Sequence, residues 1–162
     1  MLTLTDIQRV LNSEGNRMIA QIQANMISEG VNATGETSDS LEHETTKYVD
    51  GFRFEIKGNE AFNWIEGGRG ATKQSQGGVL YGNILDWVFA KGIDIGDESP
   101  EAVAAKITKT IHESGTLLHR LGETRDVYTS VFSDDAVENL VTTLEEKLAG
   151  DIEDVVFKHW SL

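Results

Sequence analysis

The chain has 162 residues, enough for one domain that buries about 70% of the surface of its unfolded form, so no metal or disulfide is needed for stability. It contains no cysteine, which excludes thiol catalysis, disulfides and thiolate metal sites. The 27 acidic residues outweigh 14 basic ones and give a formal charge of −13, which argues against a phosphate-gripping surface and against tight nucleic-acid binding.

The N-terminal sequence carries no targeting signal that we recognise. It has no basic region and no apolar run of the kind found in secretory signals. No stretch of the chain approaches the ~18 apolar residues that a membrane-spanning helix needs. We therefore expect a soluble protein that stays inside the cell that makes it and contacts no membrane.

A long helix is predicted near the N-terminus. The segment from Thr5 to Gln8 has the pattern of a capping box and predicts the start, and Gly30 predicts the end. Gly15 falls on the apolar stripe of this helix. It is either a weak point that costs roughly 1 kcal/mol relative to alanine or a place where another backbone approaches closely, and we favour the weak point. The stripe consists of Ile7, Val10, Leu11, Met18, Ile19, Ile22 and Met26.

A β-hairpin is predicted next. Residues 41–49 resemble an irregular strand, residues 52–56 alternate between apolar and polar, and Asp50-Gly51 between them favours a tight turn. A further strand or an aromatic turn at residues 61–65 would extend this sheet. Residues 127–132 are rich in β-forming side chains and are predicted to return to it.

Two central helices follow. The first has Ile84, Trp87, Val88 and Lys91 on one face and closes at Gly92. The second begins at Ser99-Pro100, because serine is a good N-cap and proline suits the first helical position, and it ends before Gly115. Its predicted buried stripe is Val103, Ile107 and Ile111.

A final helix is predicted after the cap at Ser133, with a kink or stop at Gly150-Asp151 and an end near Trp160. Its acidic polar face either lines a channel through which DNA slides or is an ordinary solvated outer face. The apolar face, which we expect to hold the core, consists of Val137, Leu140, Val141, Leu144, Leu148, Ile152 and Val155.

Together these elements predict an α+β fold. A small antiparallel sheet with a β-hairpin would pack against the long N-terminal helix, two central helices and the C-terminal helix. No internal repeat, linker or low-complexity tract interrupts the chain, so we expect residues 1–162 to form a single domain.

The sequence motifs that resemble catalytic or metal sites all fail at a required position. A phosphate loop needs glycine directly before Lys73, and Thr72 stands there. A zinc-protease motif beginning at His112 would need histidine where Thr116 stands. The residues flanking His43 alternate along the predicted strand, so the three side chains cannot all face one metal. We therefore predict no catalytic residues, no cofactor site and no metal site.

An aromatic and glycine-rich region stands out. Trp64 and Trp87 flank a loop that is rich in glycine, residues 67–78, and we expect the two indoles to be buried structural anchors. We expect the loop to be a flexible contact arm, because its glycines permit many backbone conformations. Arg69 and Lys73 are isolated positive charges in it, which favours contact with an acidic partner such as another copy of this chain.

These residues also carry a resemblance to a known family. Trp64, Glu66, Gly68 and Arg69 match a Trp-x-Glu-x-Gly-Arg element, and the helix from Trp87 ends in Lys91-Gly92-Ile93. With Ala33-Thr34-Gly35 upstream, the chain resembles the neck and tail-completion proteins of tailed bacteriophages over about half its length, residues 33–116. It departs from them in a loop without prolines, residues 71–78, and the segment after Thr116 has no pattern that we can place.

The resemblance implies a non-enzymatic virion protein that forms a sixfold or twelvefold homo-oligomeric ring between the portal and the tail. Its partners would be the portal or an adaptor ring and tail proteins, with DNA only as passing cargo. It would be found in the virion, and in the host cytoplasm during assembly. The residues expected to contact a neighbour are Gly68, Arg69, Gly70 and Lys73. The expected structural anchors are Trp64, Trp87, Gly35 and Gly92.

A second interpretation comes from a different class of protein. The chain could be a small acidic enzyme or regulatory module with a pocket around Trp64, Trp87 and Arg69. Assembly into a ring would favour the first interpretation, and a persistent monomer that binds small molecules would favour the second.

Overall fold

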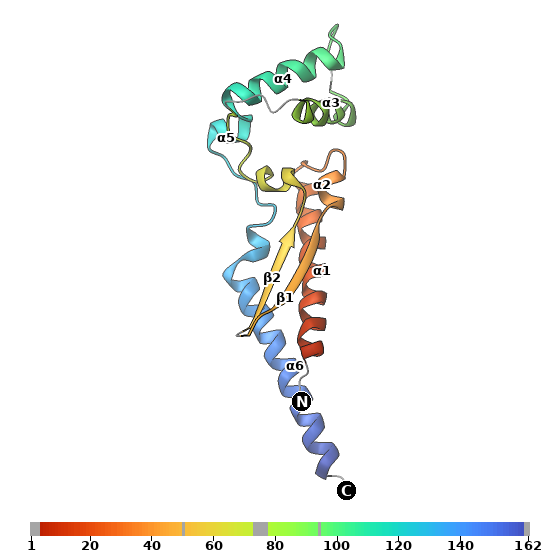
Figure 1. Cartoon of the computed structure of the whole chain (residues 1–162), viewed down its shortest axis with the longest axis vertical. Coiled ribbons are helices and arrows are strands. Elements are labelled where there is room, and N and C mark those ends of the chain that lie inside the picture. The colour runs from red at the N-terminus through yellow and green to blue at the C-terminus, as the bar shows by residue number, and fades with distance from the viewer. Residues whose placement is uncertain (1–3, 50, 73–77, 94, 161–162) are drawn as a thin grey trace. The chain divides into compact units, whose positions relative to one another are not determined.

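The α+β class is confirmed by a computed structural model of the chain, which describes residues 4–49, 51–72, 78–93 and 95–160 (Figure 1). Within these residues, helices dominate and the strands form one antiparallel pair. The elements are α1 Leu4–Ser28, α2 Glu36–Asp39, β1 Glu42–Lys47, β2 Phe52–Lys57, the 3-10 helix η1 Glu60–Trp64, α3 Val79–Lys91, α4 Pro100–Ser114, α5 Leu117–Leu121, the 3-10 helix η2 Ser130–Phe132 and α6 Asp134–Trp160.

The chain divides into two compact units. The first combines Met1–Asn25, Leu41–Lys57 and Tyr128–Leu162, and the second combines Met26–Ser40 and Gly58–Val127. The first unit therefore holds most of α1, the hairpin and α6, and the second holds the aromatic and glycine-rich region. The single domain expected from the sequence stays a prediction.

Helix α1 ends as predicted. Gly30 takes a positive φ of 66°, its N–H donates to the Ile27 carbonyl at 3.0 Å, and the Val31 N–H donates to the Met26 carbonyl at 2.9 Å. This pair of bonds is a Schellman motif, which favours glycine at this position. The helix begins at Leu4, so Thr5 lies inside it and the predicted cap there is wrong. The predicted stripe is largely confirmed, because Val10, Leu11, Met18, Ile22 and Met26 are buried.

The hairpin forms as predicted, with an antiparallel register that pairs Glu42 with Lys57 and Lys47 with Phe52. Strand β1 ends two residues earlier than expected, and the Tyr48 N–H donates to the Gly51 carbonyl across the turn at 2.8 Å. Asp50, half of the predicted turn pair, lies outside the described residues.

Gly15 of α1 packs closely against the hairpin. A Cβ at Gly15 would lie 2.5 to 2.9 Å from three ring atoms of His43 on β1. The imidazole also stacks on Phe54, with 6.0 Å between the ring centroids, and its Nε2 lies 3.2 Å from Asn16 Oδ1. The interpretation of Gly15 as a mere weak point is therefore wrong: something does approach closely, and it is a side chain rather than a backbone.

The sheet has no further strand from residues 61–65 or 127–132: of the two alternatives for residues 61–65, an aromatic turn forms and a strand does not. Residues 60–64 form η1, a helical turn capped by the Asn59 side chain, which accepts from the Ala61 N–H. The segment 127–132 is not a strand, because its amides bond elsewhere. The Val127 N–H donates to a Glu66 carboxylate oxygen, and the Val131 and Phe132 N–H groups both donate to the Tyr128 carbonyl. The predicted return to the sheet is therefore wrong.

The central helices are confirmed. Helix α3 closes at Gly92, which takes a left-handed φ of 57°, and Val88 is buried as expected. Helix α4 starts with the Ser99 side chain accepting from the Ala102 N–H at 3.2 Å and with Pro100 in the first turn. Ile111 of its predicted stripe is buried, while Val103 and Ile107 are half-buried.

Helix α6 starts at the predicted cap, since Ser133 Oγ accepts from the Ala136 N–H at 3.3 Å. It runs through Gly150 and Asp151 to Trp160, so the predicted end is confirmed and the predicted stop is wrong, while the alternative of a kink stays a prediction. A single glycine costs only about 1 kcal/mol in a helix, and the flanking residues favour helix. The expected burial of its apolar face also fails near the start, where Val137 is 50% exposed and Val141 is 47% exposed.

Candidate functional site

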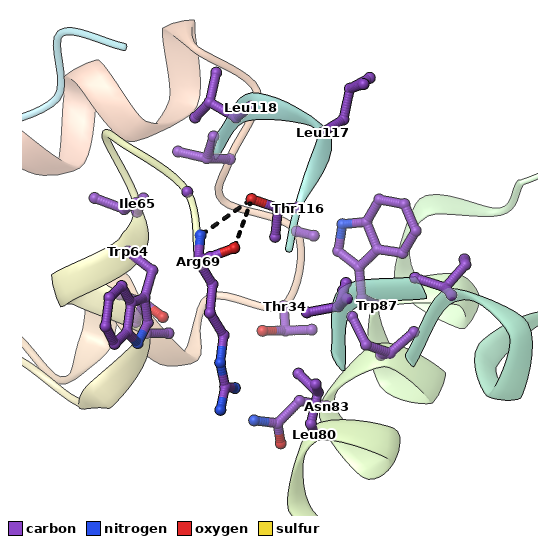
Figure 2. A pocket seen from close by; sticks show the side chains of 18 of the residues that line it. Thr34, Trp64, Ile65, Arg69, Leu80, Asn83, Trp87, Thr116, Leu117 and Leu118 are labelled. Atoms are coloured by element: carbon purple, nitrogen blue, oxygen red, sulfur yellow. Dashed lines mark hydrogen bonds between the residues drawn. The ribbon is translucent and has the colours of Figure 1, made fainter. Parts of the chain in front are cut away.

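The main candidate site is a cavity of about 1190 Å³ in the second unit (Figure 2). Trp64 at the end of η1, Arg69 in the glycine-rich loop and Trp87 on α3 all line it, as do Thr116 and Leu117 at the start of α5. The structure brings Trp64, Arg69 and Trp87 to one cavity. These are the residues around which the second interpretation of the sequence placed a pocket. In the view of Figure 2, the Arg69 side chain lies between the two indoles.

The two indoles are not buried as expected. Trp64 is 42% exposed and Trp87 is 36% exposed, and both residues line the cavity. Val79 and Leu117 also line the cavity and are 70% and 62% exposed. Large side chains left open in this way cannot contribute the stability of a closed core. They form an apolar surface suited to contact with another molecule.

The glycine-rich loop is held against the start of α5. The Arg69 N–H donates to Thr116 Oγ1 at 3.0 Å, and a dashed line marks this bond in Figure 2. The Thr116 N–H in turn donates to the Arg69 carbonyl at 2.8 Å. Thr116 also caps α5 by accepting from the His119 N–H. One threonine thus fixes both the loop and the helix beside it.

Glycine is required at the points where these segments meet. Gly68 takes a φ of +72°, and a Cβ there would lie 2.4 Å from Thr116 Oγ1 and 2.8 Å from the His119 nitrogen. A Cβ at Gly115 would lie 2.7 Å from the Arg69 carbonyl oxygen. The backbones can approach this closely only because neither residue has a side chain.

Further bonds hold Glu66, the residue before this loop, and Thr72, the last residue that the structure describes before residue 78. The Glu66 carbonyl accepts from the Arg125 N–H at 3.0 Å, and its buried carboxylate accepts from the Val127 N–H at 2.8 Å. Farther along, Thr72 Oγ1 is hydrogen-bonded to His112 Nδ1 at 2.6 Å. Residues 67–72 of the expected contact arm, 67–78, are therefore held against the protein's own surface through Arg69 and Thr72, and Lys73 lies outside the described residues.

The cavity is positively charged on a strongly negative chain. Among the described residues, five basic side chains line it against three acidic ones, on a chain with 14 basic and 27 acidic residues. The Arg69 Nε atom is buried without a hydrogen-bond partner in the described part of the chain. Lys91 donates to the Gly30 carbonyl at 2.8 Å, and Lys106 pairs with Glu98. The basic lining residues are Arg69, Lys91, Lys106, Arg120 and Arg125, and the acidic ones are Glu36, Glu60 and Asp86.

The expected glycine anchors occupy positions that favour glycine. Gly35 precedes α2 with a φ of 84°, and Gly92 follows α3 with a φ of 57°. Both angles lie in the left-handed region, where an L side chain is strained. Gly70, an expected neighbour contact, lies against the His119 ring, whose Nε2 would be 3.2 Å from an added Cβ.

Within residues 4–49, 51–72, 78–93 and 95–160, no group of three or more potential metal ligands comes together. No helix in that part of the chain is long and apolar enough to cross a membrane. The clearest electrostatic pair lies on the hairpin of the first unit. There the Lys57 ammonium bonds the Glu44 carboxylate, which lowers the pKa of Glu44 and raises the pKa of Lys57.

Comparisons with protein-family models, with curated proteins and with solved structures found no match. The structure itself adds functional candidates that sequence reasoning missed. Arg120 and Arg125 join Arg69 at the cavity from about 50 residues farther along the chain. No short motif places them there, because the close approach at Gly68 and Gly115 is a tertiary contact.

Proposed function

We propose that this chain is a non-enzymatic connector protein of a bacteriophage neck, which forms a homo-oligomeric ring between the portal and the tail. The observation that carries the proposal is the cavity, with its half-exposed indoles and its excess of arginine. Tryptophan and arginine are the residues that most often dominate the energy of protein–protein contacts. The resemblance of residues 33–116 to neck and tail-completion proteins supplies the kind of assembly.

Burial against another protein would stabilise this surface. Trp64, Val79, Trp87 and Leu117 expose apolar area that is unfavourable in water and becomes favourable once a partner covers it. The ring would be sixfold or twelvefold and would contact the portal or an adaptor ring and tail proteins. DNA would pass through as cargo, since a charge of −13 repels phosphates rather than binding them. The protein would be found in the virion, and in the host cytoplasm during assembly.

Two observations test this proposal together. The gene should lie among portal, capsid and tail genes, and the protein should co-sediment with purified portal or tail assemblies. Trp87→Ala should reduce this co-sedimentation, while the exposed Phe89→Ala on the same helix but outside the cavity lining should not. A gene in an unrelated neighbourhood, together with no binding to either assembly, would refute the connector function.

A second candidate function rests on the same cavity. The convergence of Trp64, Trp87 and Arg69 also suits a regulatory module or enzyme that binds an anionic small molecule. Such pockets usually measure about 300–1000 Å³, and this cavity is larger, so we favour the protein contact. Thermal-shift measurements with nucleotides and dicarboxylates test the alternative. A stabilised monomer that fails to bind portal or tail assemblies would favour it.

A further inference from the structure

We propose that the cavity of one copy binds the first half of α6, residues 134–147, from a second copy. The inference rests on the proposed ring, because it names the contact that would join neighbouring subunits. It uses two surfaces that the chain carries and that are each exposed: the basic apolar cavity and an acidic apolar helix face.

The apolar face of α6 was expected to be buried, but it is exposed near the start of the helix. Val137 and Val141 are about half exposed and lie four residues apart, so they share one side of α6. Leu144 continues this side and is half-buried. An exposed stripe of this kind on a helix is the usual form of a helix that docks in an apolar groove.

Charge complementarity selects this segment as the occupant. Residues 134–147 contain five acidic side chains and one lysine, whereas the cavity has a basic excess on an otherwise acidic protein. Among the described residues no ion pair is recorded for Arg69, Arg120 or Arg125. The acidic residues are Asp134, Asp135, Glu138, Glu145 and Glu146, all of them exposed.

The sizes of the two surfaces also agree. The two turns that carry Val137, Val141 and Leu144 are about 11 Å long and about 10 Å wide, so they occupy roughly 850 Å³, whereas all of residues 134–147 would occupy about twice that volume. The cavity of about 1190 Å³ can contain these two turns, and the rest of residues 134–147 would lie at its rim. Trp64 and Trp87 would then cover Val137 and Val141, while the arginines would face the carboxylates.

This contact is heterologous, because it joins two different surfaces. Each copy that docks its α6 into a neighbour keeps its own cavity available for the next copy. Copies therefore add head to tail, and such a contact gives a closed ring when the rotation between copies closes.

Cross-linking between different copies tests the contact directly, because the natural chain has no cysteine. Leu117→Cys places a thiol at the cavity and Val141→Cys places one on α6. The two single variants are mixed at up to about 1 mM, where even a contact with a millimolar Kd is well populated, and treated with a short bismaleimide. Asn139→Cys is the matched control, since it is exposed and about 200° around the same helix from Val141.

We expect the mixture of the 117 and 141 variants to form covalent dimers at least tenfold more than the mixture of the 117 and 139 variants. Charge exchange provides an independent check. Arg120→Glu or Glu138→Arg alone should reduce the cross-link several-fold, and the 117 variant with Arg120→Glu should regain it when mixed with the 141 variant carrying Glu138→Arg. The cross-link should also weaken as salt is raised, because exposed charges are screened.

The possible outcomes test the contact between copies and the closed ring independently. Oligomers without selective cross-linking between 117 and 141 would overturn the contact while leaving the connector function in place. Selective cross-linking in open filaments or dimers would support the contact and contradict the closed ring. Equal cross-linking by the 139 and 141 variants, or none up to about 1 mM, would overturn the contact.

Discussion

At the residue scale, the cavity wall depends on glycines whose missing Cβ atoms make room for specific neighbours. Gly68 needs both its positive φ and the space beside Thr116 and His119, whereas the adjacent Gly67 meets nothing within 4 Å. The two neighbouring positions therefore offer a matched pair of substitutions with opposite expected effects.

Gly68→Ala should lower the free energy of unfolding by about 2–4 kcal/mol, because the left-handed backbone and the overlap with Thr116 both oppose a Cβ. Gly67→Ala should leave stability unchanged or raise it by about 0.4–1 kcal/mol, since it restricts only the unfolded chain. Urea denaturation monitored by circular dichroism measures both. Equal stabilities of the two variants would contradict the close approach at Gly68.

Gly15 gives a second residue-scale prediction. Gly15→Ala should destabilise the protein by about 1–2 kcal/mol, because the overlap with the His43 ring outweighs the better helix propensity of alanine. Gly82→Ala in α3, where nothing lies within 4 Å, should instead stabilise it by up to about 1 kcal/mol. Adding His43→Ala should remove most of the penalty at Gly15. A fully additive double-mutant cycle would show that the two residues do not interact.

Trp64 and Trp87 were expected to be buried anchors, and their exposure changes the predicted cost of removing them. A fully buried tryptophan loses about 3–5 kcal/mol on truncation to alanine, so these half-exposed indoles should lose about 1–2 kcal/mol. Thermal unfolding of Trp64→Ala and Trp87→Ala measures this. Losses of 3 kcal/mol or more would restore the interpretation of the indoles as core residues.

At the element scale, the sequence predicts most helices and the hairpin because their signals are local. Gly30, Ser99 and Ser133 end or begin helices through bonds to residues within a few positions. The prediction of a strand at residues 127–132 is wrong because β-propensity is a local property. It does not reveal that the Val127 N–H donates to the Glu66 carboxylate, 61 residues away in the sequence. The cavity lining could be predicted only in part for a similar reason. Trp64, Arg69 and Trp87 could be proposed together from the sequence. The contribution of Arg120 and Arg125 depends on tertiary packing.

The hairpin carries a pH-dependent pair. Lys57 lowers the pKa of Glu44 by hydrogen bonding and by charge attraction, so the pair stabilises the hairpin above the ordinary glutamate pKa. This contribution is lost as the pH falls through the lowered pKa of Glu44. A carboxyl NMR titration should find the pKa of Glu44 below that of an exposed glutamate, and Lys57→Met should return it to the ordinary range. An unchanged pKa in that variant would show that the pair does not form in solution.

At the scale of the whole molecule, the proposed assembly would explain both the acidity and the exposed apolar surfaces. A chain with a charge of −13 repels its own copies at long range, so contact between copies needs a local basic surface. In the contact that we propose, the cavity supplies that surface and α6 supplies acidic and apolar groups to meet it. Association should consequently be sensitive both to cavity charge reversal and to salt.

The mass of the native assembly tests the central claim most directly. Multi-angle light scattering of the full chain, at concentrations up to about 1 mM, should detect a closed species of sixfold or twelvefold the 17.8 kDa chain mass. Arg120→Glu should shift that species toward monomer without changing the circular dichroism spectrum. A monomer at every concentration, unchanged by the presence of portal or tail assemblies, would contradict the account.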